Sequence, residues 1–166
     1  AIKTPLGMVV HSGDFKIDST PVDGEMMDLT RLGEIGRSGV KLLMCESTNV
    51  EREGYTHSER RVGESFIRYF DEYKKKRIII STFSSNVHRV QQIIDIAVKY
   101  GRKVAITGRS MINVIGAAIE LEYMKVPEGT LIDIADIKKY PPSKIVIVST
   151  GSQGEPMSAL YRMAFN

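Results

Sequence analysis

The pattern of apolar and polar residues along this chain alternates between short apolar runs and longer amphipathic stretches. The apolar runs predict strands at residues 8–10, 41–45, 77–82, 103–107 and 144–149. The amphipathic stretches predict helices at residues 25–36, 58–76, 87–100 and 111–124, and a further helix that begins at Met157. Strands that alternate with helices of this length predict an α/β fold, a mainly parallel sheet flanked by helices on both faces.

The front of the chain and its remainder differ in pattern. The segment AIKTPLGMVVHSGDF predicts two β segments around Pro5 and Gly7, and the polar stretch ESTNVEREGYTHSE is the best candidate for a boundary. We therefore predict a front segment at residues 1–55 and an α/β domain at residues 56–166. The first residue is alanine and the last predicted helix lacks a stop signal, so we expect the chain to be a piece of a longer protein, truncated within the second domain.

Composition indicates the class of protein and its location in the cell, but it does not identify a reaction or a ligand. The 166 residues are 42% hydrophobic and 26% charged, without a long apolar run or a signal-peptide pattern, which predicts a cytoplasmic globular protein without a membrane segment. Cys45, the single cysteine, follows three apolar residues, and we expect a buried and inert thiol. The net charge of +3 permits a polyanionic partner but does not require one.

Polar turns follow four of the predicted strands: ESTN, FSSN, TGRS and TGSQG. The carboxyl edge of a parallel sheet is where ligands bind, and glycine-containing turns with free N–H groups at helix starts favour an anion such as phosphate. The alternatives are structural. Any βα turn needs small residues, Ser85 or Asn86 could cap the next helix, and Ser58 is well placed as another cap. Phe83 could stack on a base or pack in the core.

The chain carries no complete catalytic set of its own. Asp14 follows a β run, where its carboxylate could ligate a metal or cap a turn. The three histidines, His11, His57 and His88, form no closely spaced pair, and the sequence contains no P-loop, G-x-G-x-x-G or G-x-S-x-G motif.

Taken in order, the segments IKTPLGMVVHSGDFKID, ESTNVEREGYTHSER, STFSSNVHRVQQI, TGRSM and STGSQGEPMSAL resemble the ribonuclease J family, in the β-CASP branch of the metallo-β-lactamase superfamily. The resemblance implies a piece of a metallo-β-lactamase core at residues 1–55 and a Rossmann-like β-CASP domain at residues 56–166. It also implies a parent enzyme with two metal ions, usually zinc, that degrades single-stranded RNA from a 5′-monophosphate end and cuts internally, in RNA processing and decay.

The resemblance also assigns residues. Asp14 matches the carboxylate that bridges the two metals, and Glu46 matches the acidic residue of the first β-CASP motif, which supports the metal site. The RNA-facing loops match the following residues: Ser84, Ser85, Asn86, His88, Arg89, Ser152, Gln153 and Gly154. The H-x-H-x-D-H run and three further histidine motifs would lie outside the chain. We therefore expect the chain alone to be inactive, and its parent to be a homo-oligomer or to associate with RNA-decay proteins.

Two other functions stay open at this point. One is a non-catalytic α/β module that binds a small phosphorylated ligand through its turns. The other is a structural or interaction fragment in which every polar turn is a cap. An H-x-H-x-D-H run in the upstream reading frame would distinguish the nuclease from both.

Overall fold

The computed structural model describes residues 1–22 and 25–165. It divides the chain into two compact units, Ala1–Arg61 and Val62–Asn166. This division lies close to the polar stretch in which the composition changes. The assignment of residues 1–55 and 56–166 to two named domains stays a prediction.

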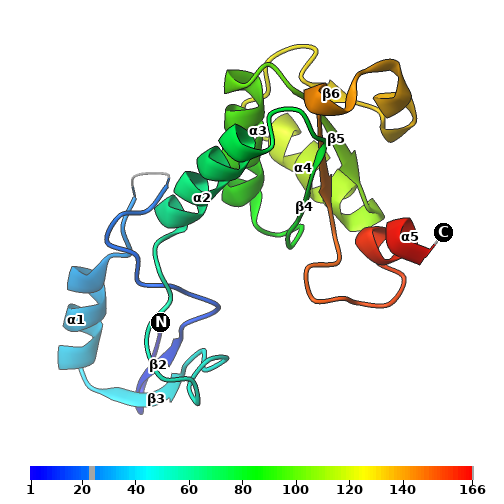
Figure 1. Ribbon diagram of the computed structural model, residues 1–166. Helices are drawn as coiled ribbons and strands as arrows, with labels where there is room; N and C mark the ends of the chain where they lie inside the picture. Colours follow the sequence, from blue (N-terminus) through cyan, green and yellow to red (C-terminus); the bar gives the residue numbers. More distant parts are fainter. Residues whose placement is uncertain (23–24, 166) are drawn as a thin grey trace. The chain divides into compact units, whose positions relative to one another are not determined.

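A three-stranded sheet with the order β1-β2-β3 forms the first unit (Figure 1). The two predicted β segments are β1 (Ile2–Thr4) and β2 (Gly7–His11), which pair antiparallel. β3 (Val40–Met44) pairs in parallel with β2 and follows the helix α1 (Leu29–Arg37). The predicted strand at residues 41–45 is therefore confirmed.

The first unit leaves most of its apolar side chains exposed. Val10 is the buried hydrophobic residue in the described part of this unit, and all five residues of β3 are exposed. Cys45 is exposed too, so the prediction of a buried thiol is wrong. The physical reason is that a sheet buries its faces only under a second layer, and the described residues of this unit contribute one nine-residue helix.

A four-stranded parallel sheet forms the second unit, with the order β4-β7-β5-β6. Its strands are β4 (Ile78–Ser81), β5 (Lys103–Thr107), β6 (Leu131–Ile132) and β7 (Ile145–Ser149). β7 is central and all five of its residues are buried, as expected for a parallel strand covered on both faces.

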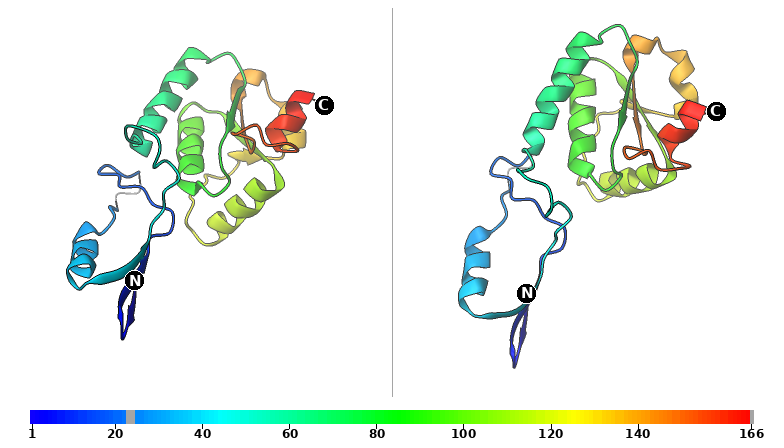
Figure 2. Two further views of the ribbon diagram at one scale, coloured as in Figure 1. Left: turned by 90° about the horizontal axis from the view of Figure 1, so that it is seen from below. Right: turned by 60° about the horizontal axis from the view of Figure 1, so that its bottom comes forward.

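Helices flank this sheet on both sides, which confirms the predicted fold class (Figures 1 and 2). α2 (Glu59–Glu72), α3 (Val87–Lys99) and α4 (Arg109–Glu120) lie on one side. The short helices η1 (Ile134–Lys139) and α5 (Ala159–Phe165) lie on the other. A third short helix, η2 (Pro142–Lys144), leads directly into β7.

The core of the second unit lies between the sheet and α2, α3 and α4. Its buried members are apolar side chains of these helices, Val104 of β5, alternate residues of β7, and Met124, which follows α4. They are Phe70, Val90, Ile93, Ile94, Ile96, Ala97, Val104, Met111, Ile115, Ala118, Met124, Val146 and Val148.

Several predicted boundaries and one strand are corrected. α1 begins at Leu29 rather than at residue 25, because the Asp28 side chain accepts a hydrogen bond from the Arg31 N–H at 2.8 Å and caps the helix. α2 ends four residues before the predicted end at Lys76. α4 runs from Arg109 rather than 111 and ends at Glu120 rather than 124. β6 was not predicted, because its two residues lie inside the irregular stretch.

Candidate functional site

Three polar turns meet at the carboxyl edge of the four-stranded sheet. FSSN follows β4, TGRS follows β5 and TGSQG follows β7, and β7 lies between the other two strands. β4 and β7 are neighbours in the sheet, so FSSN and TGSQG end adjacent strands. The grouping with ESTN is wrong, because ESTN follows β3 of the other sheet in the other compact unit.

A row of hydroxyl side chains ends these three strands. Ser81, Ser149 and Thr107 stand opposite one another in the parallel register. The Ser81 hydroxyl donates to the Ser149 carbonyl at 3.3 Å. The Ser149 hydroxyl is buried and has no hydrogen-bond partner among the described residues. The edge thus combines side-chain donors and acceptors with the main chain of the turns.

The FSSN turn serves both as a cap and as an accessible loop. The Asn86 side-chain oxygen accepts from the Arg89 N–H at 3.0 Å and caps α3, which confirms the structural alternative for this atom. Ser84 is half-buried, whereas Ser85 is exposed. Phe83 is 47% exposed and stays outside the core cluster. The turn therefore leaves a hydroxyl and an aromatic face accessible to a ligand.

The first turn of α3 carries two cationic or titratable side chains. His88 is exposed, and Arg89 is half-buried. The Arg89 guanidinium lies 3.5 Å from the hydroxyl of Thr82, a buried residue that follows β4 directly. A helix N-terminus and a guanidinium both favour an anion at this end of the sheet.

The TGSQG turn is tightly folded on itself. Gly151 is buried with a φ of 111°, and a Cβ there would lie 2.5 Å from the Ser158 hydroxyl. The Gln153 N–H donates to a Glu155 carboxylate oxygen at 3.1 Å, and the Gly154 N–H donates to the Gly151 carbonyl at 3.1 Å. The three predicted residues here, Ser152, Gln153 and Gly154, are all exposed.

A shallow pocket of about 540 Å³ lies between the TGRS and TGSQG turns and the start of α5. Arg109 and Arg162 supply two positive charges to its lining, against one negative charge from Glu155. The N-terminus of α4 also lines this pocket. Its N-cap residue, Gly108, has no side chain to accept hydrogen bonds from the first N–H groups of the helix. The sequence-based prediction missed both arginines, although Arg109 stands inside the TGRS motif that marked the turn.

The first unit brings Asp14 and Glu46 to one pocket of about 440 Å³, which His11 also lines. The Ser12 hydroxyl accepts from the Glu46 N–H at 2.9 Å and so ties the end of β3 to the end of β2. A Glu46 carboxylate oxygen accepts from the Thr48 N–H at 2.7 Å. Hydrogen bonds from the Thr48 side chain and backbone lower the pKa of Glu46 and keep it anionic.

These residues fit part of a metal site. The exposed Asp14 carboxylate is a suitable oxygen ligand, and Glu46 is already held by its own turn. In the described part of the chain, however, no three His, Cys, Asp or Glu residues are grouped closely enough to hold a metal ion. The remaining ligands of such a site would have to come from other polypeptide.

Comparison with known proteins identifies the family. Residues 75–166 match the family model described as "Ribonuclease J, beta-CASP domain". Over 164 residues, 99% of this chain, the sequence is 50% identical to a ribonuclease J of Helicobacter pylori, 47% identical to one of Corynebacterium glutamicum and 44% identical to one of Thermus thermophilus. The chain spans 24%, 23% and 28% of these relatives, about a quarter of their length. We conclude that this chain belongs to the ribonuclease J family.

Proposed function

We propose that the full-length protein is a metal-dependent ribonuclease that degrades single-stranded RNA from a 5′-monophosphate end and also cuts internally. The relatives that support this proposal are named ribonuclease J, and this chain is similar to them over almost its whole length. In this proposal the second unit holds the RNA, and the first unit contributes to the metal site. The chain by itself does not hydrolyse RNA.

The convergence of three donor-rich turns at one sheet edge carries the proposal. The main chain of FSSN and TGSQG and the side chains of Ser85, His88 and Gln153 would contact phosphate and ribose. Such contacts are independent of base sequence, which suits an enzyme that moves along RNA. Phe83 is available for stacking on a base. Ser84, Asn86, Arg89, Ser152 and Gly154 complete the proposed RNA-binding loops.

Asp14 and Glu46 have the metal-related roles in this proposal. Two metal ions, zinc in this proposal, would supply hydroxide at neutral pH and charge neutralisation at the scissile phosphate. The Asp14 carboxylate would be the ligand that this chain contributes to both ions. The Glu46 carboxylate, oriented by Thr48, would position the surrounding polar groups. Neither side chain is placed to complete a site with the described residues alone.

We further propose that the enzyme acts in the cytoplasm, in RNA processing and decay, as a homo-oligomer or together with RNA-decay proteins. None of the helices in the described part of the chain has the length and apolar composition that crossing a membrane requires.

The test substitutes the exposed polar side chains of the two turns in the full-length enzyme. Ser85→Ala, His88→Ala and Gln153→Ala are compared on 5′-monophosphorylated and 5′-hydroxyl RNA at one fixed salt concentration. Each exposed contact with a charged group is worth about 0.3–1 kcal/mol, so each substitution should weaken RNA binding about two- to fivefold. The loss should be larger on the 5′-monophosphorylated substrate.

Ser143→Ala is the matched control, because Ser143 lies in η2 at the amino end of β7, on the opposite edge of the sheet. It should leave both substrates unaffected. If the three test variants bind and cleave both RNAs as the wild type does, the turns are caps and the RNA site lies elsewhere. If they lose affinity for free phosphate but not for RNA, the turns bind a small phosphorylated ligand instead.

A further inference from the structure

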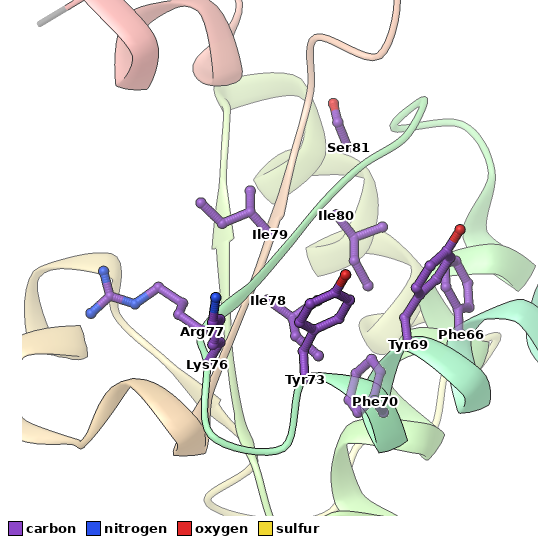
Figure 3. Close-up of a pocket in the computed structure, with 10 residues that line it drawn as sticks. All are labelled: Phe66, Tyr69, Phe70, Tyr73, Lys76, Arg77, Ile78, Ile79, Ile80 and Ser81. Carbon is purple, nitrogen blue, oxygen red and sulfur yellow. The ribbon is translucent and has the colours of Figure 1, made fainter.

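Positive side chains gather at the amino edge of the four-stranded sheet, the edge opposite the FSSN and TGSQG turns. Lys76 and Arg77 directly precede β4, and Lys144 directly precedes β7. β4 and β7 are neighbours whose first residues lie one position apart in the parallel register, so these three side chains belong to adjacent chain segments. Figure 3 shows Lys76 and Arg77 where the chain enters β4, with the Arg77 side chain extending away from the aromatic residues of α2.

The ends of two helices add further lysines at this edge. Two lysines follow α2, and Lys99 is the last residue of α3. The Asp71 carboxylate of α2 interacts electrostatically with both Lys74 and Lys99, so the ends of the two helices lie close together. The Lys144 amine lies 3.5 Å from the position that a Cβ would have at Gly101, in the loop after α3. We call the following exposed residues the amino-edge patch: Lys74, Lys75, Lys76, Arg77, Lys99 and Lys144.

The amino-edge patch concentrates the positive charge of the chain. Its six cations outnumber the neighbouring carboxylates of α2, Asp71 and Glu72, by four, which exceeds the net charge of +3 of the whole chain. Asp71 forms an ion pair with Lys74 at 3.2 Å. Within the described part of the chain, the other five patch residues form no ion pair. Their charge therefore faces solvent without a neutralising partner from the described residues.

Helix ends alone do not account for this patch. Cations are favoured within the last turn of a helix, because the helix dipole is negative there. That explanation fits Lys99, which ends α3, and Lys74, which lies two residues after α2. Lys76 and Arg77 lie further from α2, at the start of a strand, and Lys144 ends a helix of only three residues. These last three cations therefore require another explanation.

The phosphate backbone of RNA fits this patch better than a protein surface does. Lysine and arginine neutralise the phosphates of nucleic acids, whereas lysine is depleted at protein–protein interfaces. Exposed lysines bind phosphate as point charges, and such contacts carry no information about base sequence. The strands between the two edges have four or five residues and span about 15 Å. The patch is therefore within reach of a long RNA that is held at the turns.

We infer that the amino-edge patch is a second RNA-binding surface, which holds the phosphate backbone of a long RNA whose 5′ region lies at FSSN and TGSQG. The inference rests on the proposed function, because that proposal makes RNA the substrate and places its 5′ region at the opposite edge of the sheet. The turns bind the end of the RNA, and the patch keeps a longer substrate bound between successive cleavages. A short RNA occupies the turns alone.

The first experiment compares RNAs of two lengths in the full-length protein. Arg77→Gln and Lys144→Gln are combined in one variant, and dissociation constants are measured for 5′-monophosphorylated RNAs of about 6 and about 40 nucleotides, with EDTA to prevent cleavage. The loss of two phosphate contacts should weaken binding of the long RNA about tenfold at physiological salt and reduce its salt slope, log K against log salt, by about 1.4. Binding of the short RNA should be unchanged.

The matched control combines Lys3→Gln and Lys125→Gln, which changes the net charge equally at exposed positions outside the patch. It should leave the binding of both RNAs unaffected. Equal losses for the two variants would show a general charge effect and overturn the inference. An unchanged affinity of the patch variant for the long RNA, or an equal loss on the short one, would overturn it too. A wild-type protein that binds neither RNA would contradict the proposed function, and this inference with it.

The second experiment locates the long RNA on the wild-type full-length protein. 4-Thiouridine is placed either near the 5′ end of the RNA or in the part that the short RNA lacks, and the cross-linked peptides are mapped by mass spectrometry, again with EDTA. The 5′ label should cross-link to FSSN and TGSQG. The other label should cross-link to peptides that contain residues 74–77 or 144. If this second label reaches only segments outside the patch, the inference is overturned.

Discussion

At the scale of single residues, Asp14 and Glu46 share a pocket but have different surroundings. Asp14 is exposed, whereas Glu46 is half-buried and held by the backbone of its own turn. Hydrogen bonds from Thr48 lower the pKa of Glu46, and ionisation of this carboxyl therefore stabilises the folded protein. The stability that it contributes is present above the pKa of the unfolded chain and is lost as pH falls through the lower pKa of the folded protein.

We predict that Asp14→Ala and Glu46→Gln are nearly silent for the fold of residues 1–166 but severe in the full-length enzyme. Asp14→Ala removes a direct metal ligand. Glu46→Gln removes a supporting charge, which commonly costs about 10–100-fold in metal affinity or activity. Zinc content and RNA turnover of the full-length variants are the measurements. Wild-type turnover of Asp14→Ala would exclude the metal role of this carboxylate.

Gly151 has a conformation and a space that exclude a side chain. Its φ of 111° is in the region that favours glycine, and an added Cβ would lie 2.9 Å from the Leu160 Cβ at the start of α5. Gly151→Ala should therefore destabilise the second unit by about 1–3 kcal/mol, because strained backbone positions cost that much. The measurement is urea unfolding.

Gly154→Ala is the control for this substitution. Gly154 also has a positive φ, 72°, but an added Cβ there meets no atom within 4 Å. It should be less destabilising than Gly151→Ala, and the difference reports the crowding against α5. Equal losses for the two variants would show that backbone strain alone matters at this turn.

At the scale of elements, hydrogen bonds from Arg102 connect the segment after α2 to the residue that precedes β5. Arg102 is 3% exposed, and its guanidinium donates to the Lys76 and Tyr73 carbonyls at 2.9 and 3.0 Å. The guanidinium also lies 5.1 Å from the centre of the Phe70 ring. Burial lowers the pKa of Arg102, but the group stays charged at neutral pH. These bonds satisfy carbonyls that follow the last turn of α2.

We predict that Arg102→Met lowers the free energy of unfolding by about 2–4 kcal/mol. The methionine keeps the apolar contact with Phe70, but the Lys76 carbonyl loses its guanidinium donor, and a hydrogen bond to a charged group is worth about 1.5–3 kcal/mol. The second lost bond adds less, because the Tyr73 carbonyl still accepts from the Lys76 N–H at 3.0 Å. Urea unfolding measures the loss, with Lys138→Met on the exposed surface of η1 as control. A loss no larger than that of Lys138→Met would show that water replaces the guanidinium.

At the scale of the whole molecule, the two units differ in how many apolar side chains they bury. The second unit buries a continuous apolar cluster, whereas in the described part of the first unit Val10 is the one buried hydrophobic residue. Folding free energy derived from apolar burial is therefore concentrated in the second unit. The metal-related carboxylates lie in the unit with the smaller core.

We predict that residues 1–166 melt cooperatively through the second unit, and that excess zinc hardly moves the transition. Metal that binds only the native state would raise the melting temperature by an amount that grows with the logarithm of its concentration relative to its dissociation constant, and the described residues lack a complete ligand set. Calorimetry with and without zinc is the measurement. Zinc-dependent hydrolysis of RNA by the purified chain would contradict this prediction.

Local pattern by itself determined most elements of the second unit. The strand at residues 103–107 was predicted with the bounds that the structure has, and α3 begins at Val87, as its asparagine cap indicates. The polar turns were also visible, because glycine and small polar residues interrupt the apolar periodicity. Helical and strand periodicity depend on near neighbours in the chain, so a reader of the sequence can detect them.

The tertiary structure decided what lies next to what. Strand order places β7 between β4 and β5, and this order brings FSSN, TGSQG and TGRS to one edge and separates ESTN from them. Arg102 and β6 were invisible in the pattern, because the partners of Arg102 lie 26 and 29 residues away and β6 pairs with β5 through only two residues. Contacts between distant segments depend on how whole layers pack, which no local window of sequence contains.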